Sequence, residues 1–192
     1  MGGRFSRLTE AEYQWFEENT YFARVEIMKL HKIFSNLTKS TMIMPKDQFL
    51  SMAELKNNPF KFRIFDVFCE NGEHVSFREF AHFLSVFSDE ASMEIKSYFA
   101  FLIYDANEDD FLDIDDLNYV IESIAGSELT YKEIKVCIDK ILSEADVDGD
   151  GKLSYIEFEH VIQRSPNFRK YFISNLAHLL FGWFNKLICN IK

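Results

Sequence analysis

Apolar residues recur every three or four positions along most of this sequence of 192 residues. That period places them on one face of an α-helix, and only three prolines and seven glycines interrupt it. No segment shows the alternation of a β-strand, apart from single apolar residues inside short polar loops. The pattern therefore predicts an all-α fold.

A twelve-residue repeat marks the loops between these predicted helices. Its copies align on an apolar residue at the eighth position and on an aromatic residue or leucine just after the twelfth. Four copies begin at Leu37, Phe68, Asp105 and Asp146, and we name them the first to fourth loops in that order. We expect four helix–loop–helix units in two paired lobes.

The fourth loop, residues 146–157, reads DVDGDGKLSYIE and carries the complete signature of an EF-hand calcium loop. A hard cation such as Ca²⁺ takes about six to eight oxygens, and alternating carboxylates supply them from one turn of chain. Gly151 at the sixth position permits the bend that aims them inward. The predicted ligands are the side chains of Asp146, Asp148, Asp150, Ser154 (directly or through water) and Glu157, and the backbone carbonyl of Lys152. The alternative is an acidic surface loop that matches by chance.

The third loop, residues 105–116, reads DANEDDFLDIDD and departs from that signature twice. Asp110 replaces the glycine, so a left-handed backbone must be held by a residue with a Cβ, at a cost of about 1 kcal/mol. Asp116 replaces the final glutamate, and a shorter carboxylate reaches an ion with fewer oxygens. A shell of about six oxygens suits Mg²⁺ as well as Ca²⁺, so we expect mixed selectivity. The predicted ligands are Asp105, Asn107, Asp109, the carbonyl of Phe111, Asp113 and Asp116.

The first and second loops, residues 37–48 and 68–79, lack the acidic residues that a cation needs, and we expect them to be metal-free. Ser76 and Glu79 nevertheless keep the ninth and twelfth positions. These are also the N-cap and third residue of the following helix, where the pair forms a capping box. The ninth and twelfth residues of the third and fourth loops allow the same purely structural interpretation.

Two further features support the pairing of the third and fourth loops. Their eighth residues, Leu112 and Leu153, are expected to join across a short two-stranded bridge. Thr130 and Glu133 have the spacing of a capping box and predict the start of the helix that leads into the fourth loop.

The net charge of −10 follows largely from these loops. Of the 31 acidic residues, seven lie in the third loop and four in the fourth. Cation binding neutralises such an excess, and nucleic acid is a poor partner for a negative field. The 21 phenylalanines are more than the core of a simple monomer needs, which points to a protein partner.

Cysteine and histidine suggest no further chemistry. Three cysteines (Cys69, Cys137 and Cys189) form an odd set without metal-type spacing, and no apolar leader with a cleavage site precedes them. A reducing cytosol is the expected location, with the cysteines as small apolar residues. The five histidines are dispersed without a nucleophile–base motif or zinc spacing, so we do not expect an enzyme.

The two ends of the chain carry separate signals. MGGRFS matches the pattern for N-myristoylation at Gly2, although an unmodified N-terminus is the alternative. A single acyl chain anchors weakly, so membrane contact is expected to be reversible. Residues 169–192 form a broad apolar face at helical spacing, too interrupted to span a membrane. This amphipathic helix is expected to lie in the protein's own groove, as core or displaceable lid, rather than on a membrane.

Several segments make the chain resemble the calcium- and integrin-binding protein family. They are ELKNNPFKFRIFDVF, FLSVFSDEASMEIKSYFAFLIYD and EFEHVIQRSPNF, together with the N-terminal MGG, the spacing of the third and fourth loops and Asp116 at the end of the third. The likeness covers most of residues 1–172. We divide the chain into an N-terminal lobe (1–90), a C-terminal lobe (91–168) and the helix at 169–192.

The resemblance implies a non-enzymatic adaptor with two working metal loops. Members of that family are typically myristoylated and bind cytoplasmic tails of membrane proteins, such as integrin α-subunits or channels, as amphipathic helices in an apolar groove. The expected function is therefore a Ca²⁺/Mg²⁺-binding adaptor, cytoplasmic and peripheral at the plasma membrane. A passive calcium buffer and a regulatory subunit of a phosphatase or kinase are the alternatives.

Overall fold

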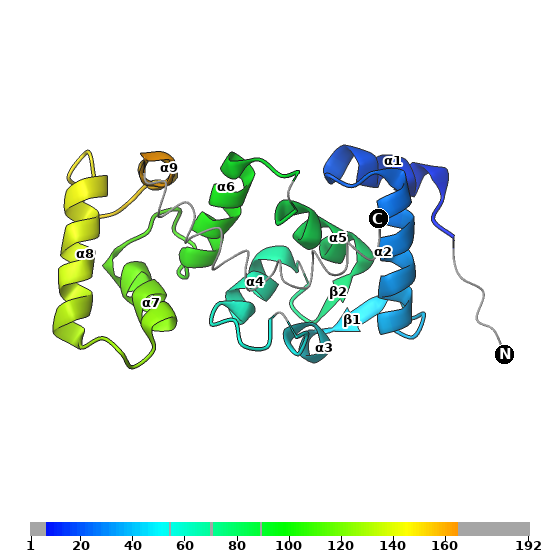
Figure 1. The fold of residues 1–192 in the computed structure, drawn as a ribbon, viewed down its shortest axis with the longest axis horizontal. Coiled ribbons are helices and arrows are strands. Elements are labelled where there is room, and N and C mark those ends of the chain that lie inside the picture. Colours follow the sequence, from blue (N-terminus) through cyan, green and yellow to red (C-terminus); the bar gives the residue numbers. More distant parts are fainter. Residues whose placement is uncertain (1–6, 54, 70, 89, 165–192) are drawn as a thin grey trace.

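The computed structural model describes residues 7–164 except residues 54, 70 and 89. This part of the chain is mostly helical and confirms the all-α prediction (Figure 1). The elements are α1 (Glu10–Asn19), α2 (Arg24–Leu37), β1 (Ile43–Pro45), α3 (Lys46–Leu50), α4 (Lys61–Phe68), β2 (His74–Ser76), α5 (Phe77–Val86), α6 (Met93–Tyr104), α7 (Ile114–Ala125), α8 (Tyr131–Ala145) and α9 (Tyr155–Arg164).

In the N-terminal half, residues 7–88, the first and second loops pair through two short strands. β1 and β2 are antiparallel, with Met44 opposite Val75. These are the eighth residues of the two loops, the position at which the third and fourth loops are also expected to join. The sequence predicted only one paired residue from each loop, but each strand has three residues. Val75 is β-branched and Pro45 has a fixed φ, and both favour extended backbone, but three residues are too few to show alternation in the sequence.

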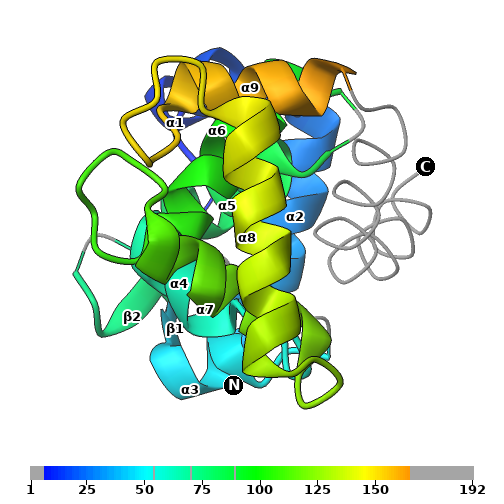
Figure 2. The ribbon, with the colours of Figure 1, turned by 90° about the vertical axis from the view of Figure 1, so that its left-hand side faces the viewer.

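In the C-terminal half, residues 91–164, the third and fourth loops pair as predicted. The Leu112 N–H donates to the Leu153 carbonyl over 2.9 Å, and the Leu153 N–H donates back over 3.0 Å. Both leucines are buried. Figure 2 shows α8 across this end of the molecule, with α7 beside it and α9 crossing one end of it. The bridge therefore holds the two acidic loops side by side.

Capping boxes begin several of the helices that flank the loops. Ser76 and Glu79 start α5, and Thr130 and Glu133 start α8, as predicted. In each, the side chain at the N-cap accepts a hydrogen bond from the third helical N–H, while the glutamate accepts one from the N-cap N–H. The same local rule fixes where the chain leaves the second loop and where the helix that leads into the fourth loop begins.

One continuous apolar core runs through both halves. At their junction α4 packs against α6. The Phe68 and Phe99 rings stack there with their centroids 4.9 Å apart, and the Phe60 ring is tilted against the Tyr104 ring with centroids 5.2 Å apart. Buried aromatic pairs stabilise a fold beyond the area that they remove from water. This packing sets the position of the C-terminal end of α6, from which the third loop starts.

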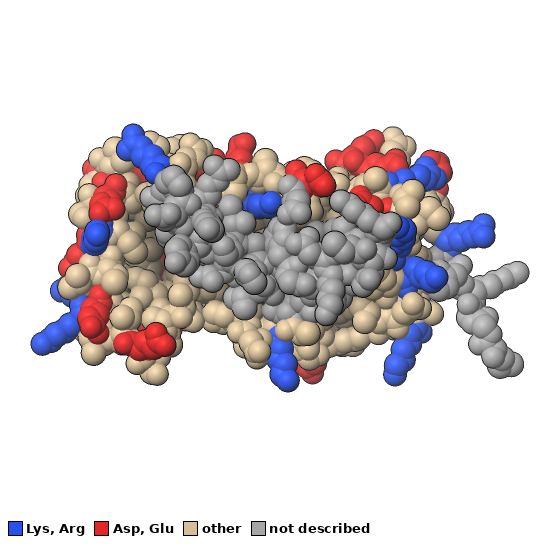
Figure 3. All heavy atoms as spheres, viewed as in Figure 1, with Lys and Arg blue, Asp and Glu red and all other residues tan. Residues whose placement is uncertain are grey.

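The face shown in Figure 3 carries acidic and basic side chains interspersed at both ends, over α7 and α8 and over α1 and α2. None of the described helices is long and apolar enough to cross a membrane. Gly2 and the helix predicted at 169–192 lie outside the described residues, and the lobe boundaries at residues 90 and 168 stay predictions.

Candidate metal centre

The fourth loop winds around its first residue. The carboxylate of Asp146 accepts hydrogen bonds from the backbone N–H of Gly149 over 2.7 Å and of Gly151 over 2.9 Å. Gly151 has φ of +85°, a conformation that costs glycine little and other residues more. The predicted bend at the sixth position is therefore present.

Three of the predicted ligands in the fourth loop converge. Oxygens of Asp146, Asp148 and Glu157 all lie within 4.8 Å of one another. Glu157 reaches back from α9, and its Oε1 accepts from the Val147 N–H over 2.7 Å. Burial acts to raise the pKa of this carboxyl, but hydrogen bonds from the backbone of Ser154 and Val147 outweigh it and lower the pKa below its ordinary value. The carboxylate is thus held ionised at the centre of the loop.

The remaining predicted ligands of the fourth loop lie around this group. Asp150 is outside the converging set, and its Oδ1 accepts from the Lys152 N–H over 2.8 Å. Ser154 donates from its Oγ to Glu157 Oε2 over 2.8 Å, and its own N–H donates to the same oxygen. The capping interpretation of Ser154 and Glu157 is therefore correct, and it coexists with the convergence of the carboxylates.

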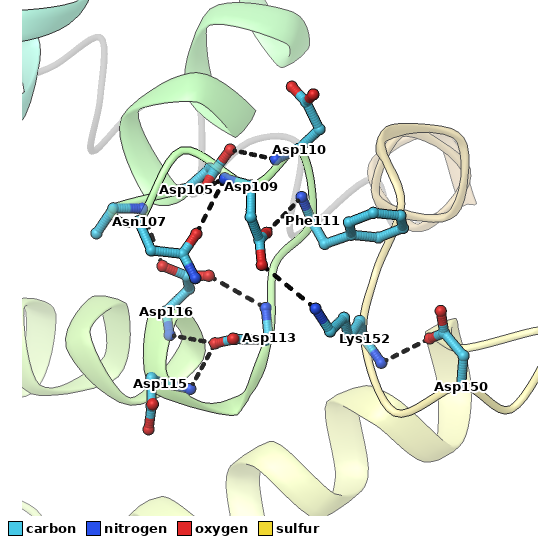
Figure 4. A network of polar contacts seen from close by, with 11 residues as sticks. Asp105, Asn107, Asp109, Asp110, Phe111, Asp113, Asp115, Asp116, Asp150 and Lys152 are labelled. Atoms are coloured by element: carbon cyan, nitrogen blue, oxygen red, sulfur yellow. Dashed lines mark hydrogen bonds and ion pairs between the residues drawn. The ribbon is translucent and has the colours of Figure 1, made fainter.

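The third loop brings together a second group of carboxylates, from Asp105, Asp109 and Asp116, again within 4.8 Å of one another (Figure 4). Asp105 accepts from the N–H of Asp109 over 3.2 Å and of Asp110 over 3.0 Å, so the chain winds around it as around Asp146. Asp110 has φ of +68°, as its position in the repeat predicts. The third loop therefore adopts the same turn without the glycine.

Asp116 and Asp105 are the two buried carboxylates of the third loop. Asp116 is 3% exposed, and it accepts from Ala106 N–H at Oδ1 over 2.9 Å and from Asp113 N–H at Oδ2 over 3.2 Å. Burial, and to a smaller extent the charges of Asp113 and Asp105, raise its pKa. Converging carboxylates without a cation repel one another. An all-oxygen set of this kind fits a hard divalent cation.

The other predicted ligands of the third loop make local hydrogen bonds. Asn107 Oδ1 accepts from the Asp109 N–H over 3.1 Å, and the Phe111 N–H donates to Asp109 Oδ1 over 3.0 Å. Asp113 caps α7, accepting from the N–H of Asp115 and of Asp116. As in the fourth loop, the ninth and twelfth residues start the following helix while the twelfth also joins the carboxylate group.

Two basic side chains that contact the third loop were not predicted from the sequence. The Lys152 ammonium lies 3.3 Å from Asp109 Oδ2 and 5.2 Å from the centre of the Phe111 ring, so the fourth loop contacts the third through a side chain as well as a backbone (Figure 4). Burial acts to raise the pKa of Asp109, but hydrogen bonds from Lys152 and Phe111 lower it. Arg63 of α4 donates to the carbonyl of Asp105. No local sequence signal marks either contact.

The first and second loops are held by other means. In the second, Asn71 Oδ1 accepts from the N–H of Glu73 and of His74, both over 3.0 Å. In the first, Thr41 Oγ donates to the carbonyl of Thr38 over 2.8 Å. Amide and hydroxyl side chains thus shape these turns where the third and fourth loops use carboxylates.

Cys69 is buried, and desolvation raises the pKa of its thiol to about 12. This agrees with its interpretation as a small apolar residue. Cys137 is a second free thiol, and Cys189 lies outside the described residues.

Comparison with known proteins places these loops in a family. A family model described as an EF-hand domain pair matches residues 94–163, which include both acidic loops. A protein named calcium and integrin-binding family member 2, from Drosophila melanogaster, is 39% identical over 181 residues, covering 88% of this chain and 96% of the relative. The human protein of that name is 36% identical, and human calcium and integrin-binding family member 3 is 35% identical, each over 179 residues with the same coverage.

Identity at this level over nearly the whole length of the relatives agrees with the resemblance that the sequence motifs suggested. It also agrees with the paired loops, the helical fold and the converging carboxylates. The chain therefore belongs to the calcium and integrin-binding family of EF-hand proteins.

Proposed function

We propose that this protein is a calcium-responsive adaptor that binds an amphipathic helix from the cytoplasmic tail of a membrane protein. The observation that carries the proposal is the convergence of three carboxylates in each of two paired loops. The names of the relatives state that those proteins bind calcium and an integrin. Ca²⁺ in both loops would relieve the repulsion between the carboxylates and bias the positions of the flanking helices.

The two loops are expected to differ in their metal. In the fourth, the ligands are Asp146, Asp148, Asp150, the carbonyl of Lys152, Ser154 and Glu157, and the long final carboxylate suits the larger Ca²⁺. In the third, the ligands are Asp105, Asn107, Asp109, the carbonyl of Phe111, Asp113 and Asp116, and we propose that Mg²⁺ competes with Ca²⁺ there. Asp116 supports this, because its carboxylate is short and is already held by two backbone N–H groups.

The partner is proposed to be apolar along one face and helical, such as an integrin α-subunit tail or a channel segment. Exposed apolar side chains in the described part of the chain support an apolar partner. Val25 and Met28, one helical turn apart on α2, are 60% and 53% exposed. Side chains three positions apart share a helix face, so these two can contact the same partner.

Calorimetry and peptide binding together test the proposal. Titration of the full chain with Ca²⁺ is expected to show two binding events, of which Mg²⁺ competes with one. A helical peptide from an integrin α-subunit tail is expected to bind more tightly with Ca²⁺ than with a chelator. Asp105→Ala combined with Asp146→Ala should remove that difference, whereas Asp139→Ala, an exposed acidic residue of α8, should not.

Equal peptide affinity with and without calcium would contradict the switching part of the proposal. An apolar-surface dye separates an adaptor from a passive buffer, because a buffer takes up calcium with little new dye binding. No calcium uptake by either loop would contradict the proposal as a whole.

We also propose that acylation of Gly2 brings the protein reversibly to the plasma membrane from the cytoplasm. The measurement is membrane fractionation of cells that express the wild type or Gly2→Ala. The variant is expected to move to the soluble fraction while its calcium titration stays unchanged. An equal membrane fraction for both proteins would contradict the role of Gly2.

A further inference from the structure

Arg63 crosses from the N-terminal half to the third loop. It belongs to α4, and its side chain is only 13% exposed. Its Nη2 donates to the carbonyl of Leu102 over 3.0 Å and to that of Asp105 over 2.6 Å. Its Nη1 forms an ion pair with Glu108 over 2.9 Å. One guanidinium therefore contacts three residues that lie about forty positions further along the chain.

These contacts fall where the chain changes from helix to loop. Leu102 and Asp105 present carbonyls at the C-terminal end of α6, which the helix itself leaves without N–H partners. Glu108, the fourth residue of the loop, has φ of +61°, a left-handed conformation that favours glycine. Arg63 therefore fixes both ends of the segment 105–108, which contains the first two candidate ligands, Asp105 and Asn107.

The arginine is itself held by a rigid support. On the same helix, Phe68 stacks on Phe99 of α6, and Phe60 at the N-cap of α4 lies against Tyr104. The pairing of a planar fork with two carbonyls and one carboxylate is geometrically specific. Lysine, with a single ammonium, cannot reproduce all three contacts in the same directions.

We propose that Arg63 is a positioning residue for the third loop and that it couples metal binding there to helix α4 of the N-terminal half. This inference rests on the proposed metal binding by that loop. Arg63 acts by holding the first ligands in place before the ion arrives, so that less ordering is needed on binding. By reciprocity, metal in the third loop then strengthens the attachment of α4.

Charge alone predicts that loss of Arg63 raises the metal affinity of the third loop, whereas the positioning role predicts that it lowers this affinity. The sign of the change in affinity therefore tests the proposal. A cationic side chain near a cation site disfavours binding, and removal of Arg63 also frees the negative charge of Glu108. On electrostatics, Arg63→Met would raise the affinity of the third loop. On positioning, both Arg63→Met and Arg63→Lys lower it, because neither side chain reproduces the guanidinium's contacts with the two carbonyls and Glu108.

The experiment is Ca²⁺ and Mg²⁺ calorimetry on the full chain. Arg63→Lys is expected to lower the affinity of the third loop about tenfold, the low end for groups that orient metal ligands, and Arg63→Met at least as much. The fourth loop is the internal reference and should not change. Lys61→Met is the matched control, since the Lys61 ammonium of the same helix donates to the carbonyl of Lys56 in the N-terminal half.

An unchanged or higher affinity of the third loop in a folded Arg63→Lys variant would overturn the proposal. If wild-type protein takes up no metal in the third loop, the proposed function fails instead, and the two failures are therefore distinct. A second readout follows amide hydrogen exchange in α4. Calcium should raise protection there in the wild type and in Lys61→Met but not in Arg63→Lys, and equal protection in all three would count against the coupling.

Discussion

Both loops hold their turns with hydrogen bonds inside their own twelve residues and contact each other, whereas the third loop is also held from outside by Arg63 of α4. The fourth has Gly151 at its bend and a glutamate at its end. The third has Asp110 and Asp116 at those positions and makes the same turn. A loop with less favourable residues can therefore keep its geometry when neighbouring elements supply the missing constraints.

The largest effect that separates the loops is expected from Glu157→Gln. Loss of the charge and of one ligand oxygen should lower the Ca²⁺ affinity of the fourth loop about 100-fold, because affinity in such loops follows ligand charge. The third loop should keep most of its affinity. Calorimetry measures both, and a loss of equal size in the two loops would show that they do not bind independently.

Asp116→Glu sharpens the comparison at the same position of the third loop. The extra methylene lets the carboxylate offer two oxygens to the ion. The ratio of Ca²⁺ affinity to Mg²⁺ affinity in the third loop should therefore rise about tenfold. The measurement is Ca²⁺ titration at fixed Mg²⁺, with Asp115→Glu as a neighbouring control outside the predicted ligand set. An unchanged preference would mean that the length of this side chain does not set selectivity.

The bend residues give a smaller effect on stability. Asp110→Gly should raise the free energy of unfolding of the metal-free protein by about 1 kcal/mol, because the left-handed backbone no longer carries a Cβ. Gly151→Ala should lower it by a similar amount for the converse reason. Denaturant unfolding in chelator measures both changes, and equal signs for the two variants would refute the argument from backbone strain.

The smallest effect is expected from Lys152→Met. The ammonium lies beside Asp109 as a tethered cation that an incoming ion must outcompete. The pair is partly exposed, so its removal should raise the metal affinity of the third loop only about twofold. The change should disappear at high salt, because screening weakens exposed charge pairs. Lys140→Met removes an exposed lysine of α8 that pairs with Glu144, and it is the control.

The features that the sequence predicted correctly are local or follow from the repeat. The pair Leu112–Leu153 was predicted from the alignment of the loops, and Met44–Val75 occupies the same position of the repeat. Capping boxes and the left-handed residue Asp110 depend on residues a few positions apart, which a single sequence displays directly.

The features that could not be predicted join residues distant in the chain. Arg63 reaches the third loop only because aromatic packing sets α4 against α6, and no short pattern encodes that distance. The side-chain direction of Lys152 depends likewise on the bridge between the loops. Asp113 was predicted both as a ligand and as a cap, and the structure shows its side chain in the capping role. Its role as a ligand stays a prediction.

The twelfth residue of each acidic loop belongs to two structures at once. Asp116 is the third residue of α7, and Glu157 is the third residue of α9, yet both carboxylates extend back across the loop to the N–H of its second residue. Any ion that draws either carboxylate inward must also turn the first coil of the helix behind it. Under the proposed metal binding, an ion a few ångströms wide would therefore change the direction of a whole helix.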